Sequence, residues 1–197
     1  MPAPVSSEQI GSARERILDA AAQVMRERGL AKSTTKEIAR AAGYSEALLY
    51  KHFADKHEIY MGVLRERVRG YVSPIELIGS GTIEGNLVQV TTQLMAFYVQ
   101  TFPMSASIFS TPELLTTWRD GMTVKGTGPR APLRNLERYL EGERELGRLS
   151  ANADPTAIAV ALCGAAFQSA FLACFYAETE VPDGEALARR TVASLRL

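Results

Sequence analysis

The chain lacks an excess of charge of either sign, and this absence excludes a protein that coats nucleic acid through bulk electrostatic attraction. Its 197 residues contain 22 lysines and arginines and 22 aspartates and glutamates. A neutral chain can still carry a local basic face. Binding to nucleic acid must therefore be argued from the pattern of residues and not from composition.

Motifs that carry catalysis or bind metals are also lacking. The two histidines, His52 and His57, are five residues apart, which is the wrong spacing for paired ligands on one helical face. No Gly-x-Ser-x-Gly motif occurs, and no glycine loop ends in Gly-Lys-Ser/Thr. Both histidines lie near the N-terminus, so the rest of the chain has no histidine to serve as the base of a nucleophile. The sequence predicts no enzyme, no metal site and no cofactor.

Cysteine is scarce, and the two cysteines cannot form a disulfide with each other within the chain. Cys163 and Cys174 lie in one helical run, where a rise of 1.5 Å per residue would separate them by about 16 Å. Buried free thiols are the simplest interpretation and indicate a reducing compartment. The first residues, MPAPVSSEQIGS, lack the basic and apolar regions of a secretory signal. We expect a cytoplasmic protein.

Charge is missing altogether from residues 155–177, a segment long enough to span a membrane. Much of this segment is alanine, and its aliphatic content is low. A helix buried between other helices is equally apolar on all sides. We therefore expect a core helix without membrane contact, and a membrane-spanning helix is the alternative.

What the sequence does contain is helical periodicity along nearly its whole length, with no convincing strand pattern, which predicts an all-α fold. Start signals divide its N-terminal part into short helices. Thr34 and Glu37 predict a capping box, and Ser45 can cap the next helix. Asp55 and Glu58 predict a second capping box that opens a longer helix.

The two short helices meet at Gly43, where glycine permits a sharp turn with positive φ. The first helix of the chain is expected to stop at Gly29. A small core against that first helix is expected from Ile38, Ala42, Leu49 and Phe53. Two short helices joined by a tight turn predict a helix-turn-helix, whose second helix can enter the major groove of DNA.

The stretch TTKEIARAAGYSEALLYKHFADKHEIY, residues 34–60, resembles the N-terminal domain of the tetracycline-repressor (TetR) family of bacterial transcriptional regulators. The resemblance is carried by Thr34, Thr35, Ile38, Ala39, Ala42, Gly43, Ser45, Leu49, Tyr50, Phe53 and Lys56. The sequence departs from the family pattern at Tyr44, where a small apolar residue is usual, and at Glu46, Ala47 and Leu48. The resemblance implies a three-helix helix-turn-helix domain followed by a larger helical domain for ligand binding and dimerisation.

The expected organisation is a flexible arm at residues 1–11, a DNA-binding domain at residues 12–56 and an effector-binding and dimerisation domain at residues 57–197. The residues expected to contact DNA are Thr34, Thr35, Lys36, Tyr44, Ser45, Glu46, Ala47, Leu48, Tyr50, Lys51, His52 and Lys56. Glutamate, alanine, leucine and lysine at 46, 47, 48 and 51 suit base edges, and the hydroxyl, imidazole and other lysine groups suit phosphates. Tyr44 could instead cover the small core, and Lys36 and Lys51 could be ordinary solvated charges.

The resemblance also implies an effector pocket and a homodimer built from the last two long helices. The expected pocket residues are Met95, Tyr98, Phe102, Met104, Phe109, Trp118, Phe167 and Phe171, which suit a mostly apolar ligand. Small residues of the dimer contact are expected at Ala161, Gly164, Ala165 and Ala166, and a seam at Leu187, Thr191, Val192 and Leu195. The alternatives are that the pocket residues are core and that the apolar helix is the core of a monomer.

These observations predict a ligand-responsive transcriptional regulator in a bacterial cytoplasm. In its simplest form it is a repressor that binds a palindromic operator as a homodimer and is released by a small, mostly apolar effector. The alternative is a ligand-binding protein or enzyme that retains the fold without binding DNA. An operator search separates the two.

Overall fold

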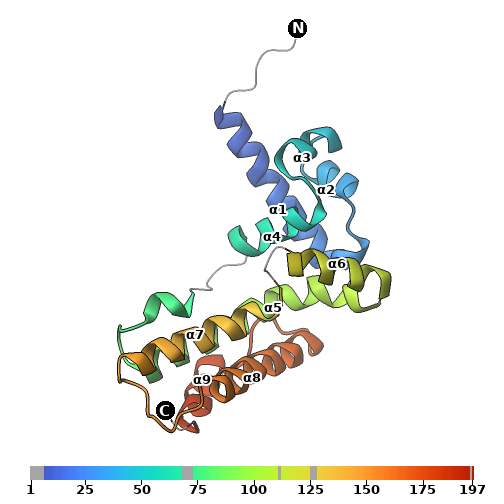
Figure 1. Cartoon of the computed structure of the whole chain (residues 1–197). Helices are drawn as coiled ribbons and strands as arrows, with labels where there is room; N and C mark the ends of the chain where they lie inside the picture. Colours follow the sequence, from blue (N-terminus) through green and yellow to red (C-terminus); the bar gives the residue numbers. More distant parts are fainter. Residues whose placement is uncertain (1–6, 68–72, 111, 125–127, 196) are drawn as a thin grey trace. The chain divides into compact units, whose positions relative to one another are not determined.

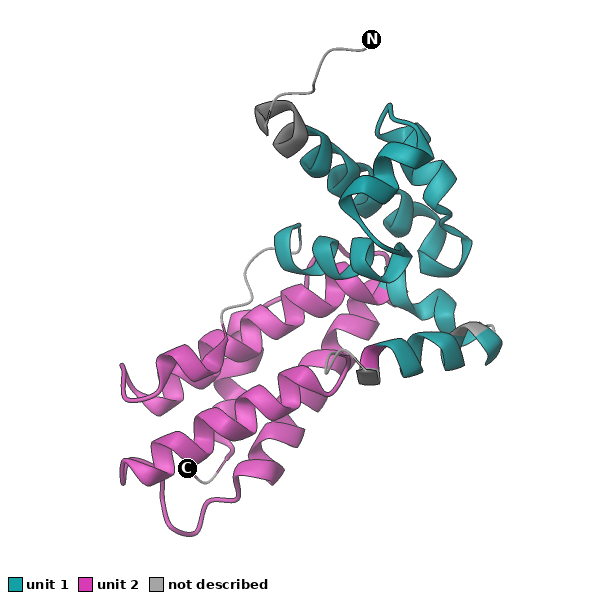
Figure 2. Cartoon of the chain, turned by 45° about the horizontal axis from the view of Figure 1, so that its top comes forward, with its two compact units in different colours: residues 1–69, 103–121 teal, residues 70–102, 122–197 magenta. Residues whose placement is uncertain are grey.

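A computed structural model describes the chain except residues 1–6, 68–72, 111, 125–127 and 196, and the described residues form helices and no strand (Figure 1). The predicted all-α fold is confirmed. Contacts divide the chain into two compact units, residues 1–69 with 103–121 and residues 70–102 with 122–197 (Figure 2).

The first unit contains the short N-terminal helices and a segment from the middle of the chain. Its elements are α1 (Ser7–Lys32), α2 (Thr35–Ala41), α3 (Glu46–His52), α4 (Lys56–Glu66), the 3-10 helix η2 (Ser107–Ser110) and most of α6 (Pro112–Val124). The described part of the expected arm, residues 7–11, is helical, and the rest of the arm lies outside the described residues. The functional boundary expected at residue 56 stays a prediction, and by contacts α4 belongs with α1 to α3.

The centre of the first unit is α1, which packs against α2, α3, α4 and η2. The buried side chains of this unit include Ile17, Leu18, Met25, Ile38, Ala39, Leu49, Phe53, Ile59 and Val63. Ala42, expected in this core, is only half-buried, because α2 ends at Ala41 and Ala42 is its C-terminal cap. Arg14 joins α1 to α4 through a two-pronged ion pair with Glu66, at 2.6 and 2.7 Å, and lies over the ring of Phe53.

The helical path of α1 is interrupted at Gly29, near the expected stop, where φ is 73°. A Cβ atom there would lie 2.6 Å from Ser107 Oγ, so the position excludes side chains by space as well as by φ. The same hydroxyl accepts a 3.0 Å hydrogen bond from the Ala31 amide. Gly29 therefore lets the 103–110 segment approach the end of α1 within this unit.

The second unit is a layered helical domain. Its elements are the 3-10 helix η1 (Pro74–Leu77), most of α5 (Ile83–Ala106), α7 (Ala131–Glu145), α8 (Pro155–Phe175) and α9 (Gly184–Ala193). Its core draws on α5, α7, α8 and α9 through buried residues such as Leu87, Leu94, Leu136, Leu140, Leu162 and Val192. Asp154 caps α8 by accepting a 3.0 Å hydrogen bond from the Ala157 amide.

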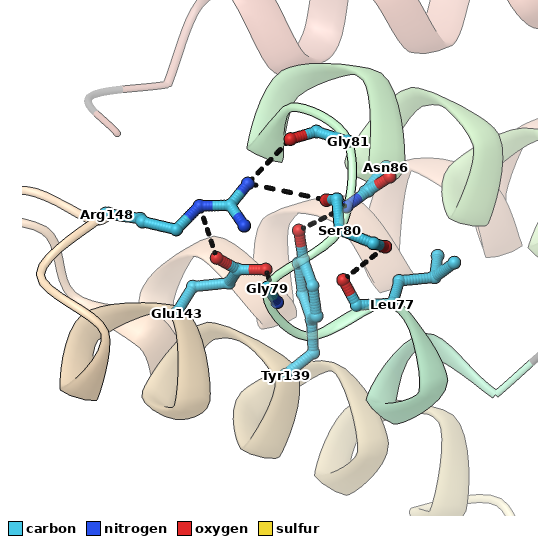
Figure 3. Close-up of polar contacts among 8 residues, drawn as sticks. All are labelled: Leu77, Gly79, Ser80, Gly81, Asn86, Tyr139, Glu143 and Arg148. Carbon is cyan, nitrogen blue, oxygen red and sulfur yellow. Dashed lines mark hydrogen bonds and ion pairs between the residues drawn. The ribbon is translucent and has the colours of Figure 1, made fainter.

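A polar cluster fixes the loop before α5 to α7 (Figure 3). The fully buried Glu143 accepts a 3.0 Å hydrogen bond from the Gly79 amide and forms a 3.1 Å ion pair with Arg148. Asn86 donates to the hydroxyl of Tyr139 at 3.1 Å. Burial raises the pKa of Tyr139 to about 12, so this hydroxyl keeps its proton at neutral pH. The buried carboxylate is compensated, as a charge in a helical core requires.

Within the described residues, α8 is long and apolar enough to cross a membrane by length and composition. The core helices of soluble proteins meet the same criterion. One side of α8 is buried in the second unit through residues such as Ala159, Leu162 and Ala166. The other face of α8 is exposed in the single chain.

Candidate nucleic-acid interface

The short helices α2 and α3 are held in place by local caps that the sequence predicts. The Thr34 hydroxyl accepts the Glu37 amide at 3.1 Å, and Glu37 accepts the Thr34 amide at 3.1 Å, so the capping box is confirmed. Hydrogen bonds from Thr34 hold the pKa of Glu37 below its usual value. Ser45 caps α3 by accepting the Leu48 amide at 3.2 Å.

The turn between them is built around Gly43, whose φ is 78°. The Gly43 amide donates to the Arg40 carbonyl at 3.1 Å, and the Tyr44 amide donates to the Ala39 carbonyl at 2.9 Å. These two bonds form a Schellman motif, which ends a helix with one left-handed residue. The motif leaves room for only Tyr44 and Ser45 before α3 begins.

The second predicted capping box, at α4, forms in an altered way. Asp55 accepts the Glu58 amide at 2.7 Å, as expected. The Glu58 carboxylate accepts the amide of Ala54 at 2.6 Å, one residue before the cap. The start of α4 is therefore fixed on both sides, and the chain leaves α3 at Phe53 in an extended conformation.

Most of the predicted DNA-contacting residues lie on α2 and α3. Thr34 and Ser45 are the N-terminal caps of these helices, Tyr44 precedes the second cap, and Lys56 is the first residue of α4. The exposed members are Thr34, Lys36, Ser45, Ala47, Tyr50 and Lys51, and the half-buried members are Thr35, Tyr44, Glu46, Leu48, His52 and Lys56. On α3, the open side is thus marked by Ala47 and Lys51, one turn apart. The opposite side is anchored by Leu49, which is fully buried.

Three of these residues are brought together by a contact that sequence reasoning missed. The Thr35 hydroxyl donates to Glu46 Oε1 at 2.5 Å and lies 3.2 Å from the hydroxyl of Tyr50. Glu46 and Tyr50 are one turn apart on α3, so both reach the first turn of α2. The four-residue spacing of Glu46 and Tyr50 indicates in the sequence that they share a face of α3. Nothing in the local sequence indicates that their partner is Thr35, eleven residues before Glu46.

Lys56 is placed differently from the other predicted phosphate ligands. Its ammonium group donates to the main-chain carbonyl of Leu30 at the end of α1. Burial lowers the pKa of Lys56, while the nearby Glu37 carboxylate opposes that shift. The structure therefore gives Lys56 a role in joining α4 to α1, and a phosphate contact would compete with it.

One basic residue near these helices was not among the expected contacts. Arg40 is exposed in the last turn of α2, one turn beyond Lys36. The four-residue spacing puts both cations on one face of the helix, and that spacing was available in the sequence. Arg28, by contrast, is paired with Glu37 at 2.6 Å.

The predicted effector residues do not form one group. Met104 and Trp118 are buried in the first unit, where the Trp118 ring packs against His57 and Tyr60 of α4 at centroid distances of 5.0 and 5.3 Å. Phe109, in η2, is 72% exposed. Met95 is buried in the core of the second unit.

The remaining four predicted effector residues form a row of aromatic rings between α5 and α8. The Phe167 ring contacts Tyr98 at 5.4 Å and Phe102 at 5.8 Å, and Phe102 contacts Phe171 at 5.6 Å. Phe167 and Phe171 are still 46% and 42% exposed. We call these four residues the aromatic row.

A groove in the described residues lies elsewhere in the second unit. It measures about 530 Å³ and is lined by residues of α5 and of the region that begins α9, including Thr92, Ala96, Glu180, Asp183 and Arg189. None of the predicted effector residues lines it. The groove is open, and charged side chains such as Glu180, Asp183, Glu185 and Arg189 are among its lining residues, so it is a poor match for a mostly apolar ligand.

The free side of α8 carries no charge along its length. Its exposed residues are Thr156, Ala157, Val160, Ala161, Gly164, Phe167, Gln168, Phe171, Leu172 and Phe175, followed by Tyr176 at the cap. Two members of the expected dimer contact, Ala166 and Val192, are instead buried in the chain's own core. A continuous exposed apolar face of this kind marks an interaction surface.

The capped helices, the Schellman turn and the open side of α3 form a helix-turn-helix, an arrangement that many DNA-binding domains use. Residues 17–61 match the model of a family described as bacterial regulatory proteins, tetR family. Over these residues the chain is similar to the TetR family of regulators. The match extends from α1 into α4 and includes the turn at Gly43.

Curated relatives match the same region. The chain is 40% identical over 62 residues to the HTH-type transcriptional activator FasR of Mycolicibacterium smegmatis. The aligned segment covers 32% of this chain and 28% of FasR. It is 47% identical over 51 residues to the HTH-type transcriptional repressor BepR of Brucella suis, and this aligned segment covers 26% of the chain and 24% of BepR. The aligned segments therefore span less than a third of either relative.

The fold of the larger part is supported by solved structures. The transcriptional regulator FadR from Bacillus subtilis, solved in complex with stearoyl-CoA, aligns with a TM-score of 0.65 over 92% of this chain and 97% of that chain. The sequence identity of 18% means that the likeness concerns the fold alone.

Replacing Lys56 by methionine should destabilise the protein, whereas Lys51→Met should not. Methionine keeps the unbranched side chain but removes the donor to the Leu30 carbonyl. We expect the free energy of unfolding to fall by about 1–2 kcal/mol for Lys56→Met and to change by less than about 0.5 kcal/mol for the exposed Lys51→Met. Urea denaturation measures both, and equal stabilities would contradict the structural role of Lys56.

Proposed function

We propose that the protein is a transcriptional repressor that binds a palindromic operator as a homodimer and is released by a small, mostly apolar effector. The observation that carries the proposal is the geometry of α3. Ser45 caps it, Leu49 anchors it and Ala47 and Lys51 stand on its open side. A helix held in this way can enter the major groove.

Each group on this surface has a chemical counterpart on DNA. Lys51 can donate to guanine, and Ala47 or Leu48 can meet a thymine methyl group. Hydroxyls of Thr34, Thr35, Ser45 and Tyr50, with the cations of Lys36 and Arg40, suit phosphate oxygens, which fix register without reading sequence. Tyr44 and His52, both half-buried beside this surface, complete the proposed contact area.

Selection of duplexes from a random or genomic pool tests the DNA-binding proposal. The expected product is a palindrome whose half-sites lie about 34 Å apart, one turn of DNA. Lys51→Met should weaken binding to the selected duplex by about 1–3 kcal/mol per half-site and relax the preference at one base pair of each half-site. Arg138→Met, which removes an exposed cation from α7, is the matched control. Failure to enrich any sequence would favour the alternative, a ligand-binding protein or enzyme that retains the fold.

The homodimer is supported by the uncharged open face of α8. Ala161, Gly164, Gln168 and Leu172 are exposed along this face. A Cβ atom at Gly164 would meet nothing within 4 Å, so the chain itself does not need glycine there. Small residues allow two helices to approach closely. A second copy of α8, with α9 beside it, would complete a four-helix bundle.

Ala161→Glu should convert the dimer into a folded monomer. Ala161 is exposed in the single chain, so the substitution leaves the protomer core intact but would bury a charge between two copies of α8. Sedimentation velocity measures the mass. Ala47→Glu makes the same change on an exposed helical alanine of α3 and should remain dimeric. A dimeric Ala161→Glu variant would place the interface on another surface.

The effector site is proposed at the aromatic row, because its rings are apolar, clustered and still accessible from solvent. The structural neighbour FadR was solved with stearoyl-CoA, which makes long-chain acyl thioesters the first compounds to test. The row shares α5 with residues 103–106, which belong to the unit that contains the DNA-binding helices. Movement of α5 would therefore reach that unit through the chain itself.

Titration of acyl-CoA thioesters of different chain length into the complex with the selected duplex tests this site. The expected result is release of DNA, followed by fluorescence anisotropy of the duplex. Phe167→Ser should weaken the response at least several-fold by removing a ring from the row. Phe109→Ser, which alters an exposed ring outside the row, should leave it unchanged. Equal responses of the two variants would exclude the aromatic row as the effector site.

The proposed setting is the bacterial cytoplasm, without membrane contact and without catalysis. The two cysteines are free, and burial raises the pKa of Cys163 to about 11, so this thiol is unreactive at neutral pH. The relatives that match the N-terminal domain are described as transcriptional regulators.

A further inference from the structure

The contact of Thr35 with Glu46 and Tyr50 has a consequence for DNA binding. Thr35 Oγ1 lies 2.5 Å from Glu46 Oε1 and 3.2 Å from the Tyr50 hydroxyl. Thr35 and Glu46 are half-buried, and Tyr50 is 50% exposed. The three groups join the first turn of α2 to the first two turns of α3, at the surface proposed to face DNA.

Counting protons fixes the direction of both hydrogen bonds. A threonine hydroxyl has one proton, and a carboxylate only accepts. The proton of Thr35 is therefore directed to Glu46, and the Tyr50 hydroxyl must donate its own proton to Thr35 Oγ1. Both hydroxyl protons point along one chain that ends on the carboxylate of Glu46.

Phosphate oxygens of DNA also only accept hydrogen bonds. A contact from Thr35 or Tyr50 to a phosphate therefore requires a proton that the free protein already uses, because Tyr50 donates to Thr35 and Thr35 donates to Glu46. The same carboxylate adds a negative charge beside the place where the phosphate would bind. Glu46 thus opposes DNA binding in two ways. Its negative charge repels the phosphate, and it accepts the hydrogen bond that keeps the hydroxyl protons within the protein.

We propose that Glu46 is a positioning residue that withholds the Thr35 and Tyr50 hydroxyls from phosphate until a matching operator is bound. The proposal rests on the proposed function of α3 in DNA binding. Generic duplexes lack the base contacts that offset the loss of the internal hydrogen bonds, so Glu46 lowers their affinity more than that of the operator. Glu46 then contributes to specificity without reading a base.

Two substitutions separate the charge from the hydrogen bonds. Glu46→Gln removes the charge, but its amide oxygen can still accept from Thr35. Glu46→Met has similar length and removes both the charge and the acceptor. Glu141→Gln removes a carboxylate from an exposed position of α7 and is the control for overall charge.

Affinity is measured for a fluorescein-labelled duplex of mixed sequence and for the duplex selected by the wild-type protein. We expect Glu46→Gln to bind the mixed duplex about fivefold more tightly, as loss of one nearby like charge predicts. Glu46→Met should bind it several-fold more tightly still, while the ratio of operator to mixed-duplex affinity falls. In a Thr35→Val, Tyr50→Phe background, the glutamine and methionine variants should bind alike.

Stability distinguishes this role from a merely structural one. Glu46→Met should unfold at lower urea concentration than the wild type and yet bind DNA more tightly, whereas a structural role would weaken both. If Glu46→Gln and Glu46→Met bind the mixed duplex equally in the wild-type background, the effect of Glu46 is due to its charge alone. That result would overturn the proposal. A changed preference at one base pair, with unchanged affinity for the mixed duplex, would show instead that Glu46 reads a base.

Failure of the proposed function would look different. The wild-type protein would then bind neither duplex at any salt concentration. A double-mutant cycle of unfolding free energies for Thr35→Val and Glu46→Met would still report coupling between the two side chains, because that measurement involves no DNA.

Discussion

The proposed DNA-binding surface depends on one backbone constraint, the positive φ of Gly43 between α2 and α3. A Cβ atom at this position would meet nothing within 4 Å, so the requirement for glycine comes from conformation and not from crowding. An L-residue in this region costs roughly 1–2 kcal/mol. The turn allows α2 to end at Ala41 and α3 to begin five residues later, at Glu46. Without it, Thr35 and Glu46 could not meet, and Leu49 would not anchor α3 against the small core.

The sequence predicted the features that depend on neighbouring residues. The box of Thr34 and Glu37 and the cap at Ser45 involve residues three apart, and their chemistry fixes their geometry. The same local reading could not find the partner of Lys56, which is the carbonyl of Leu30, 26 residues earlier. Nor could it find the packing of Trp118 on α4. Periodicity shows that a side chain is buried, but not which distant element buries it.

The same limit applies to α8, whose composition fits a monomer core, a membrane span or a dimer contact. A helix that is apolar on every side gives no preferred direction in its sequence. The structure supplies the direction, because Leu162 and Ala166 are buried whereas Ala161 and Phe171 are exposed. The effector residues were predicted by residue type for the same reason, and type did not distinguish the core packing of Met95 from the accessible ring of Phe167.

Zero net charge gives the open side of α3 a particular balance between affinity and specificity. Lys36, Arg40 and Lys51 are exposed on α2 and α3, while Arg28 is already paired with Glu37 and Glu46 adds an opposing charge. Nonspecific binding depends on such cations through counterion release, so a surface with few of them binds generic duplexes weakly. A regulator competes with a vast number of generic sites in a genome, and the ratio of specific to nonspecific affinity decides its occupancy. In the proposed role of Glu46, its carboxylate at the start of α3 lowers the nonspecific affinity, and base contacts and DNA shape restore the specific affinity. Neutral overall charge is therefore compatible with DNA binding and favours discrimination over strength.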